Sequence, residues 1–185
     1  MLRIAICDDS QDARLRLRGG VEQALDKLGQ TGDVFEFSSG LGLLGWLGWH
    51  RDSRFWPALL VPAAAFLLGS ALRRLIDRPR PYEALDFVPV FPKDTRGQSF
   101  PSRHCFSAAA IAVTALWVLP PLGGLLSAAA LVIALCRVMV GHHYISDVLA
   151  GLAFGAGAGW LGLWLAQQWL FAPTATAFFG FVIMR

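Results

Sequence analysis

The stretch CRVMVGHHYISD, residues 136–147, places an arginine, two histidines and an aspartate between two apolar runs. The run after it, Val148 to Phe171, is rich in glycine and alanine, which allow membrane helices to pack closely. The run before it, Leu125 to Val140, is interrupted only by Arg137. At about 1.5 Å per residue, both runs approach the thickness of a bilayer core when they are helical. The stretch therefore predicts two membrane helices joined by a short polar segment.

Two further apolar runs lie upstream in the chain. Phe55 to Leu72 carries no charge, and Cys105 to Leu119 is slightly shorter but can be extended back to Pro101. Leu41 to Trp49 is also apolar, but it is too short to cross a bilayer alone. The sequence therefore predicts an all-α, integral-membrane helical bundle with four spans and a partial fifth.

The composition agrees with a membrane protein. Hydrophobic residues make up 55% of the chain and charged residues only 16%, whereas about a quarter of a soluble domain is charged. Basic residues gather between residues 73 and 103 without the interleaved aromatic side chains of a nucleic-acid platform. We therefore expect the bilayer and a lipid phosphate as partners, and no nucleic acid.

The order of polar segments and apolar runs predicts which segments share a side of the membrane. If each run crosses once, residues 73–104 and 137–147 lie on one side, and the turn at Pro120 lies on the other. Several charged residues then stand at the ends of apolar helices, where charge is costly and usually functional. The unusual polar residues are therefore expected to converge at one end of the bundle.

Three clusters on this side have the chemistry of phosphoryl transfer: RRLIDRPRPY (73–82), SFPSRH (99–104) and CRVMVGHHYISD (136–147). This reaction needs charge neutralisation, an aligned nucleophile and an acid for the leaving group. Guanidinium groups make paired hydrogen bonds to phosphate, and hydroxyl and N–H groups at a helix start add donors. The phosphate-binding residues that we expect are Arg73, Arg80, Ser102, Arg103 and Arg137.

Two histidines and an aspartate are the expected catalytic residues. His143 is the expected nucleophile at phosphorus. Asp147, four residues further on, is expected to hold one imidazole N–H and leave the other nitrogen free to attack. His104 is expected to protonate the leaving oxygen.

Other readings of these residues are weaker. Arg74 and Arg78 are interpreted as positive charges that flank a membrane helix, and His142 as a bystander. A metal site built from His104, His142, His143 and Asp147 is disfavoured, because two adjacent histidines cannot easily point both rings at one ion. We therefore expect no metal and no cofactor.

The three clusters together resemble the motifs of the type 2 phosphatidic acid phosphatase superfamily, which shares its site with vanadium haloperoxidases. The family's Lys-x6-Arg-Pro matches residues 73–81, its Pro-Ser-Gly-His matches residues 101–104, and its Ser-Arg-x5-His-x3-Asp matches residues 136–147. The resemblance covers about residues 41–171. Arg73, Arg103 and Cys136 stand where the family has lysine, glycine and serine.

The resemblance implies metal-independent hydrolysis of a lipid phosphate or diphosphate through a phosphohistidine intermediate. It implies substrates such as undecaprenyl diphosphate or phosphatidic acid. It also implies a multi-pass protein of the bacterial inner membrane, with the active site on the extracytoplasmic face. One alternative is a non-catalytic membrane-bound sensor of lipid phosphate, which Cys136 favours. A vanadate-dependent haloperoxidase is disfavoured, because those enzymes are soluble.

The first 40 residues resemble the start of a bacterial response-regulator receiver domain. The pattern predicts a strand at LRIAIC (2–7), a helix from Gln11 to Leu28, and a second short strand from Val34 to Phe37. Asp8 and Asp9 are interpreted either as a magnesium-binding pair or as caps of the following helix. The predicted organisation is a truncated receiver-like, α/β-like fragment (1–40), a membrane-embedded phosphatase domain (41–171) and an apolar tail (172–185).

Overall fold

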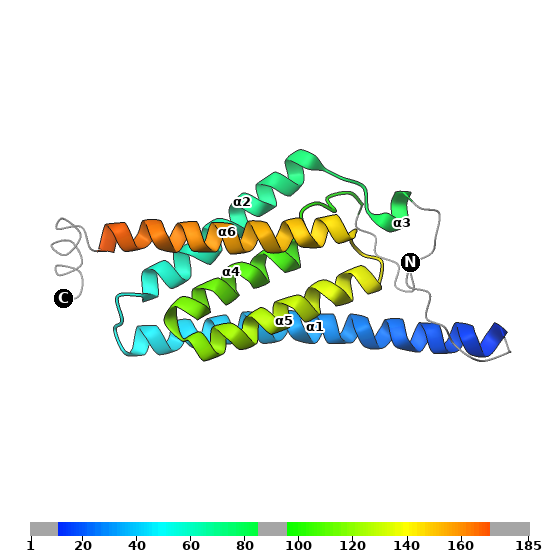
Figure 1. Cartoon of the computed structure of the whole chain (residues 1–185), viewed down its shortest axis with the longest axis horizontal. Coiled ribbons are helices and arrows are strands. Elements are labelled where there is room, and N and C mark those ends of the chain that lie inside the picture. Colours follow the sequence, from blue (N-terminus) through cyan, green and yellow to red (C-terminus); the bar gives the residue numbers. More distant parts are fainter. Residues whose placement is uncertain (1–10, 85–95, 171–185) are drawn as a thin grey trace.

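A computed structural model of the chain describes residues 11–84 and 96–170, which form helices and connecting turns. The helices are α1 (Gln11–Trp49), α2 (Phe55–Ile76), α3 (Pro81–Ala84), α4 (Arg103–Val118), α5 (Pro120–Met139) and α6 (Ile145–Leu170). No strand occurs among these described residues. The predicted all-α bundle is therefore confirmed for this part of the chain (Figure 1).

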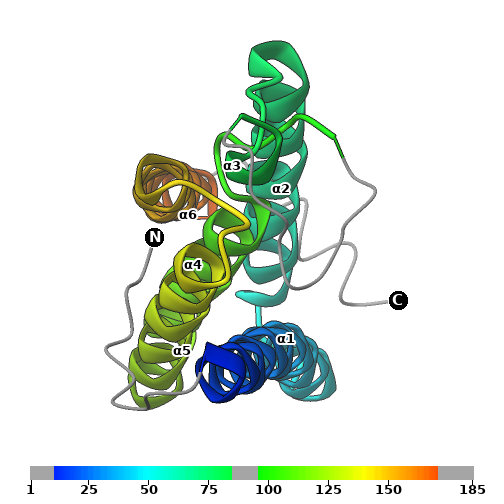
Figure 2. The same cartoon turned by 90° about the vertical axis from the view of Figure 1, so that its right-hand side faces the viewer.

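Helix α4 forms the centre of the bundle and packs against α1, α2, α5 and α6. Figure 2, seen along the bundle, shows α4 surrounded by these four helices. Small residues allow the close approach: a Cβ atom added at Gly155 of α6 would lie 2.2 Å from the carbonyl oxygen of Phe106 on α4. A Cβ atom at Gly69 of α2 would lie 2.7 Å from the Phe106 ring. Glycine at these two positions therefore sets how closely α2 and α6 approach α4.

Among the described residues, three segments are long and apolar enough to cross a membrane: Phe55–Ala84, which includes α2, Pro120–Met139 (α5) and Ile145–Gln168 within α6. The fourth expected span, Cys105–Leu119, is instead the shorter helix α4, with 16 residues. At 1.5 Å per residue α4 is about 24 Å long, which is less than the roughly 30 Å hydrocarbon core. The chain is therefore a multi-pass membrane protein, and the part that the structure describes holds three membrane-length helices where the sequence predicted four.

Helix α1 corrects the prediction for the N-terminal part. The predicted helix from Gln11 to Leu28 is helical, but α1 continues without a break to Trp49, so the predicted strand from Val34 to Phe37 is wrong. Packing decides the outcome: a Cβ atom added at Gly32 would lie 2.7 Å from Ile133 of α5. Contact of this kind stabilises a helix beyond its intrinsic propensity.

The receiver-like resemblance gains no support from α1. The predicted strand at residues 2–7 and the pair Asp8 and Asp9 lie outside the described residues. The predicted partial span, Leu41 to Trp49, is the C-terminal part of α1, and α1 is not among the three membrane-length helices. The division of the chain near residue 40 falls inside this helix and stays a prediction.

The polar clusters do converge at one end of the bundle. The segment after α2, the segment before α4 and the start of α6 meet there, because Arg78 and Ser99 both contact Asp147. Figure 1 shows α3 and the α5–α6 turn at this end, and the α4–α5 turn at the opposite end.

Candidate active site

His143 lies in the tight turn between α5 and α6, and its side chain is only 3% exposed. Its Nδ1 atom is 2.9 Å from the backbone oxygen of Ser99. A carbonyl oxygen only accepts hydrogen bonds, so Nδ1 carries the hydrogen and Nε2 keeps its lone pair. The fold therefore fixes one tautomer of His143 and leaves the lone pair of Nε2 free.

Asp147 is fully buried in the first turn of α6, and its carboxylate accepts hydrogen bonds from three donors. Its carboxylate accepts hydrogen bonds from the Ser99 hydroxyl, from the Tyr144 backbone N–H at 3.1 Å and from Arg78 Nη1 at 2.7 Å. A buried carboxylate needs such partners to offset its desolvation. The predicted hydrogen bond from His143 to Asp147 is not formed in this structure: His143 Nδ1 lies 3.7 Å from Oδ2 of Asp147, and the imidazole N–H is directed at the Ser99 carbonyl instead.

The surroundings of His143 favour the neutral imidazole. Burial lowers the pKa of His143 below its ordinary value, and the nearby charges of Arg80 and Arg73 lower it further. Interaction with Asp147 acts in the opposite direction, but the net shift is downward. The ring is therefore held in the form that can attack phosphorus.

Arg78 and Ser99 both contact Asp147, although the sequence predicted Arg78 only as a charge flanking a membrane helix and gave Ser99 no role. Arg78 lies 4.2 Å from the centre of the Tyr144 ring and also donates a hydrogen bond to the Ser146 hydroxyl at 2.9 Å. Arg78 stands two residues before Arg80 in the first cluster, which was the signal available for it. Ser99 is the first residue of the second cluster, SFPSRH, but nothing in the motif spacing marked it as a partner of His143 and Asp147.

Two of the predicted phosphate-binding arginines are anchored beside His143. Arg73, a buried residue of α2, donates from Nη1 to the backbone oxygen of Pro101 at 3.0 Å. Arg80 donates from Nε to the backbone oxygen of Gly97 at 3.1 Å. Ser102 is buried at the N-cap of α4, and its N–H donates to the backbone oxygen of Asp147 at 2.9 Å. The start of α4, where phosphate donors were predicted, is therefore hydrogen-bonded to the segment that carries His143 and Asp147.

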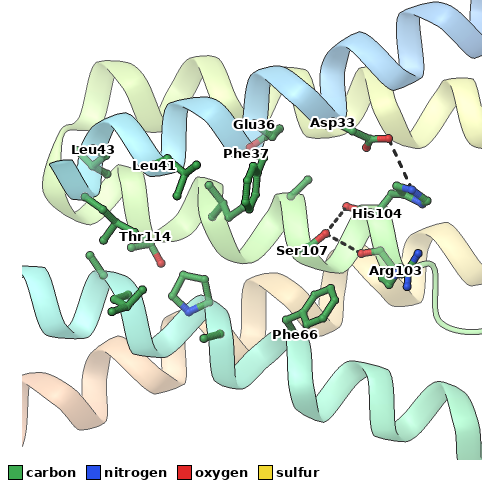
Figure 3. Close-up of a pocket in the computed structure, with 18 of the residues that line it drawn as sticks. Asp33, Glu36, Phe37, Leu41, Leu43, Phe66, Arg103, His104, Ser107 and Thr114 are labelled. Atoms are coloured by element: carbon green, nitrogen blue, oxygen red, sulfur yellow. Dashed lines mark hydrogen bonds and ion pairs between the residues drawn. The ribbon is translucent and has the colours of Figure 1, made fainter. Parts of the chain in front are cut away.

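Arg137 and His104 meet a residue that the sequence did not predict in the site, Asp33 of α1. Arg137 is buried and donates from Nη2 to Oδ2 of Asp33, and its Nη1 lies 3.7 Å from Asp26. His104 Nε2 lies 3.7 Å from the same oxygen of Asp33 (Figure 3). The Asp33 carboxylate of α1 therefore contacts both His104, the expected leaving-group acid, and Arg137, an expected phosphate-binding residue.

Cys136, which replaces the serine of the third motif, lies against α1. A Cβ atom added at Gly29 of α1 would be 3.2 Å from the Cβ atom of Cys136. Cys136 is buried at this helix contact.

A cavity of about 690 Å³ opens between α1, α2 and α4 (Figure 3). Asp33, Arg103 and His104 line its polar end, so Arg103 lies beside the expected leaving-group acid. The rest of the wall is mainly apolar and extends along α4 to Thr114. A pocket of this size matches the range that small-molecule ligands fill.

Two named phosphatases are similar in sequence. Lipid A 1-phosphatase of Rhizobium etli is 39% identical over 102 residues, which are 52% of this chain and 42% of that protein. Decaprenylphosphoryl-5-phosphoribose phosphatase of Mycobacterium tuberculosis is 38% identical over 125 residues, which are 64% and 66% of the two chains. The chain thus covers less than half the length of the lipid A 1-phosphatase.

Two solved structures share the fold. The transmembrane PAP2-type phosphatidylglycerolphosphate phosphatase of Bacillus subtilis has a TM-score of 0.61 at 22% identity, with 89% of this chain and 90% of that chain covered. LpxE of Aquifex aeolicus has a TM-score of 0.61 at 23% identity, with 85% and 98% covered. The family model of the PAP2 superfamily matches residues 54–171. The chain therefore belongs to the PAP2 superfamily, the family whose three motifs it resembles.

Proposed function

We propose that this protein hydrolyses a lipid phosphate or diphosphate through a phosphohistidine formed on Nε2 of His143. The observation that carries the proposal is the hydrogen bond from His143 Nδ1 to the Ser99 carbonyl. This bond frees Nε2 for attack, next to arginines that can neutralise phosphate.

The reaction has two steps with balanced proton transfers. Nε2 of His143 attacks phosphorus, the bond from phosphorus to the lipid oxygen breaks, and His104 gives its proton to that oxygen. Water then attacks the phosphohistidine, His104 accepts a proton from the water, and inorganic phosphate leaves. Asp147 stabilises the charge that develops on the imidazole. Arg73, Arg80, Ser102, Arg103 and Arg137 bind the remaining phosphoryl oxygens, so the proposed mechanism uses no metal.

The lipid nature of the substrate is supported by the three membrane-length helices and by the lipid phosphatases among the relatives. Undecaprenyl diphosphate and phosphatidic acid represent the two kinds of chain, prenyl and acyl, that we propose to compare. The proposed location is the bacterial inner membrane with the site on the extracytoplasmic face.

The test is phosphate release from these two lipids in detergent with EDTA present. Wild type is expected to release phosphate, and His143→Ala is expected to lose at least about a thousandfold in kcat, because the nucleophile is gone. The matched control is His50→Ala, an exposed histidine that bonds to the backbone oxygen of Trp46. No release by folded wild-type protein would overturn the enzyme proposal in favour of the lipid-phosphate sensor.

A further inference from the structure

Glu36 is the least expected group in the wall of the cavity between α1, α2 and α4. It is only 2% exposed, and neither oxygen of its carboxyl group has a hydrogen-bond partner among the described residues. Burying a polar group without a partner is costly, and native proteins rarely do so without a functional reason. A ligand in the cavity would supply the missing partner.

The rest of the cavity suits a hydrocarbon chain. Apolar side chains from three helices line it, among them Leu41, Leu44, Pro62, Phe66, Leu67 and Ile111. From His104 to Thr114 the cavity follows ten residues of α4, which is about 15 Å. An extended chain advances roughly 1.2 Å per bond, so about a dozen carbon atoms fit along this length.

Glu36 lies near the end of the cavity where the lipid chain would join its headgroup. Asp33, Arg103 and His104 mark the polar end, so under the proposed function the leaving oxygen of the lipid meets His104 here. Glu36 lies three residues beyond Asp33 on α1, which is about 4.5 Å further into the cavity (Figure 3). A group that meets Glu36 therefore belongs to the first few atoms of the lipid after its phosphate.

Resting on the proposed function, we infer that this cavity binds the lipid chain and that Glu36 donates a hydrogen bond to a carbonyl oxygen near the headgroup. The substrate class would then be acyl lipids, whose ester or amide carbonyl accepts the bond. A carboxyl group buried in an apolar wall is held in its protonated form, which makes it a donor. A prenyl chain has no such acceptor, and its binding would leave Glu36 buried and unpaired.

The decisive comparison uses two lysophosphatidic acids with the same chain of about a dozen carbons, one ester-linked and one ether-linked. They differ only in the carbonyl oxygen. Wild type is expected to favour the ester by about five- to tenfold in kcat/KM, the effect of one hydrogen bond. Glu36→Leu is expected to reduce the ester to the ether level and leave the ether unchanged, whereas Glu36→Gln keeps a donor and retains a preference. Glu22→Leu, on the same helix in an exposed pair with Arg18, is the control.

A second pair of variants tests the chain site itself. Gly40 lines the cavity, and a Cβ atom there would lie 3.4 Å from Ile111, whereas a Cβ atom at Gly42 meets nothing within 4 Å. Gly40→Phe is expected to lose at least about tenfold on both lysolipids but to keep hydrolysis of p-nitrophenyl phosphate, which has no chain. Gly42→Phe is expected to keep all three activities.

These assays distinguish a failure of the proposed function from a failure of the proposed role of Glu36 and the cavity. If wild type hydrolyses none of the three phosphates, the proposed function fails. If it hydrolyses them but treats ester and ether alike, or if Glu36→Leu keeps the ester preference, the role of Glu36 is wrong and the function stands. If Gly40→Phe processes both lysolipids like wild type, the chain lies elsewhere.

Discussion

The hydroxyl of Ser99 donates a hydrogen bond to Oδ2 of Asp147, 48 residues further along the chain. The backbone oxygen of the same serine accepts the Nδ1–H of His143. Ser99, which precedes α4, thus fixes both the Asp147 carboxylate in the first turn of α6 and the His143 imidazole in the turn before α6. Side chain and backbone have separate tasks, and this separation makes the role of Ser99 testable.

Replacing Ser99 by alanine is expected to lower kcat by about ten- to a hundredfold. The variant removes one of the three donors to a buried carboxylate, while the backbone contact to His143 remains. Single-turnover phosphate release with each variant measures the effect on chemistry. Ser127→Ala is the control, because the Ser127 hydroxyl donates a hydrogen bond to the backbone oxygen of Gly123 within α5. Wild-type rates for Ser99→Ala would show that Asp147 needs no support from this hydroxyl.

Arg78 is predicted to matter more than its neighbour Arg74, although the sequence gave both the same structural interpretation. Arg78 pairs with Asp147 and stacks on Tyr144, whereas Arg74 is exposed on α2. Arg78→Ala is expected to reduce kcat/KM by about tenfold or more, because the side chain of Arg78 is only 36% exposed and its partner is fully buried. Arg78→Lys should retain only part of the wild-type kcat/KM, since lysine lacks the planar guanidinium group with its several N–H donors. Arg74→Ala should be close to wild type, and equal losses in both variants would contradict this assignment.

The bundle and most of the convergence of site residues could be predicted from the sequence. Apolar runs and their order place residues 73–104 and 137–147 at one end, and the contacts of Ser102 with Asp147 bear this out. Periodicity could not show that Val34 to Phe37 is helical, because packing of α1 against α5 decides it. The contact between Asp33 and Arg137 was not predicted for the same reason. Without a helix packed against α5 in this region, the sequence gave no basis for placing Asp33 next to Arg137.

The pH profile should show that His143 stays neutral under mildly acidic conditions. Protonation removes the lone pair of Nε2, and burial lowers the pKa of His143 from its ordinary 6.5. The acidic limb of kcat/KM is therefore expected below pH 6.5. Arg80→Gln removes one of the charges that lower this pKa, so its acidic limb is expected at higher pH than in wild type. An acidic limb above pH 6.5 in wild type would contradict the neutral, buried nucleophile.

Asp33→Asn is expected to tighten inhibition by inorganic phosphate by about tenfold. Arg137 is buried between Asp33 and Asp26, so its charge is already matched when an anion arrives. Removing the nearer carboxylate frees a guanidinium group for charge-assisted hydrogen bonds to phosphate. The inhibition constant for phosphate, measured with p-nitrophenyl phosphate as substrate, reports the change. Glu22→Gln removes a charge from the same helix away from the site and should have no effect. Weaker inhibition in Asp33→Asn would mean instead that Asp33 holds Arg137 in its binding position.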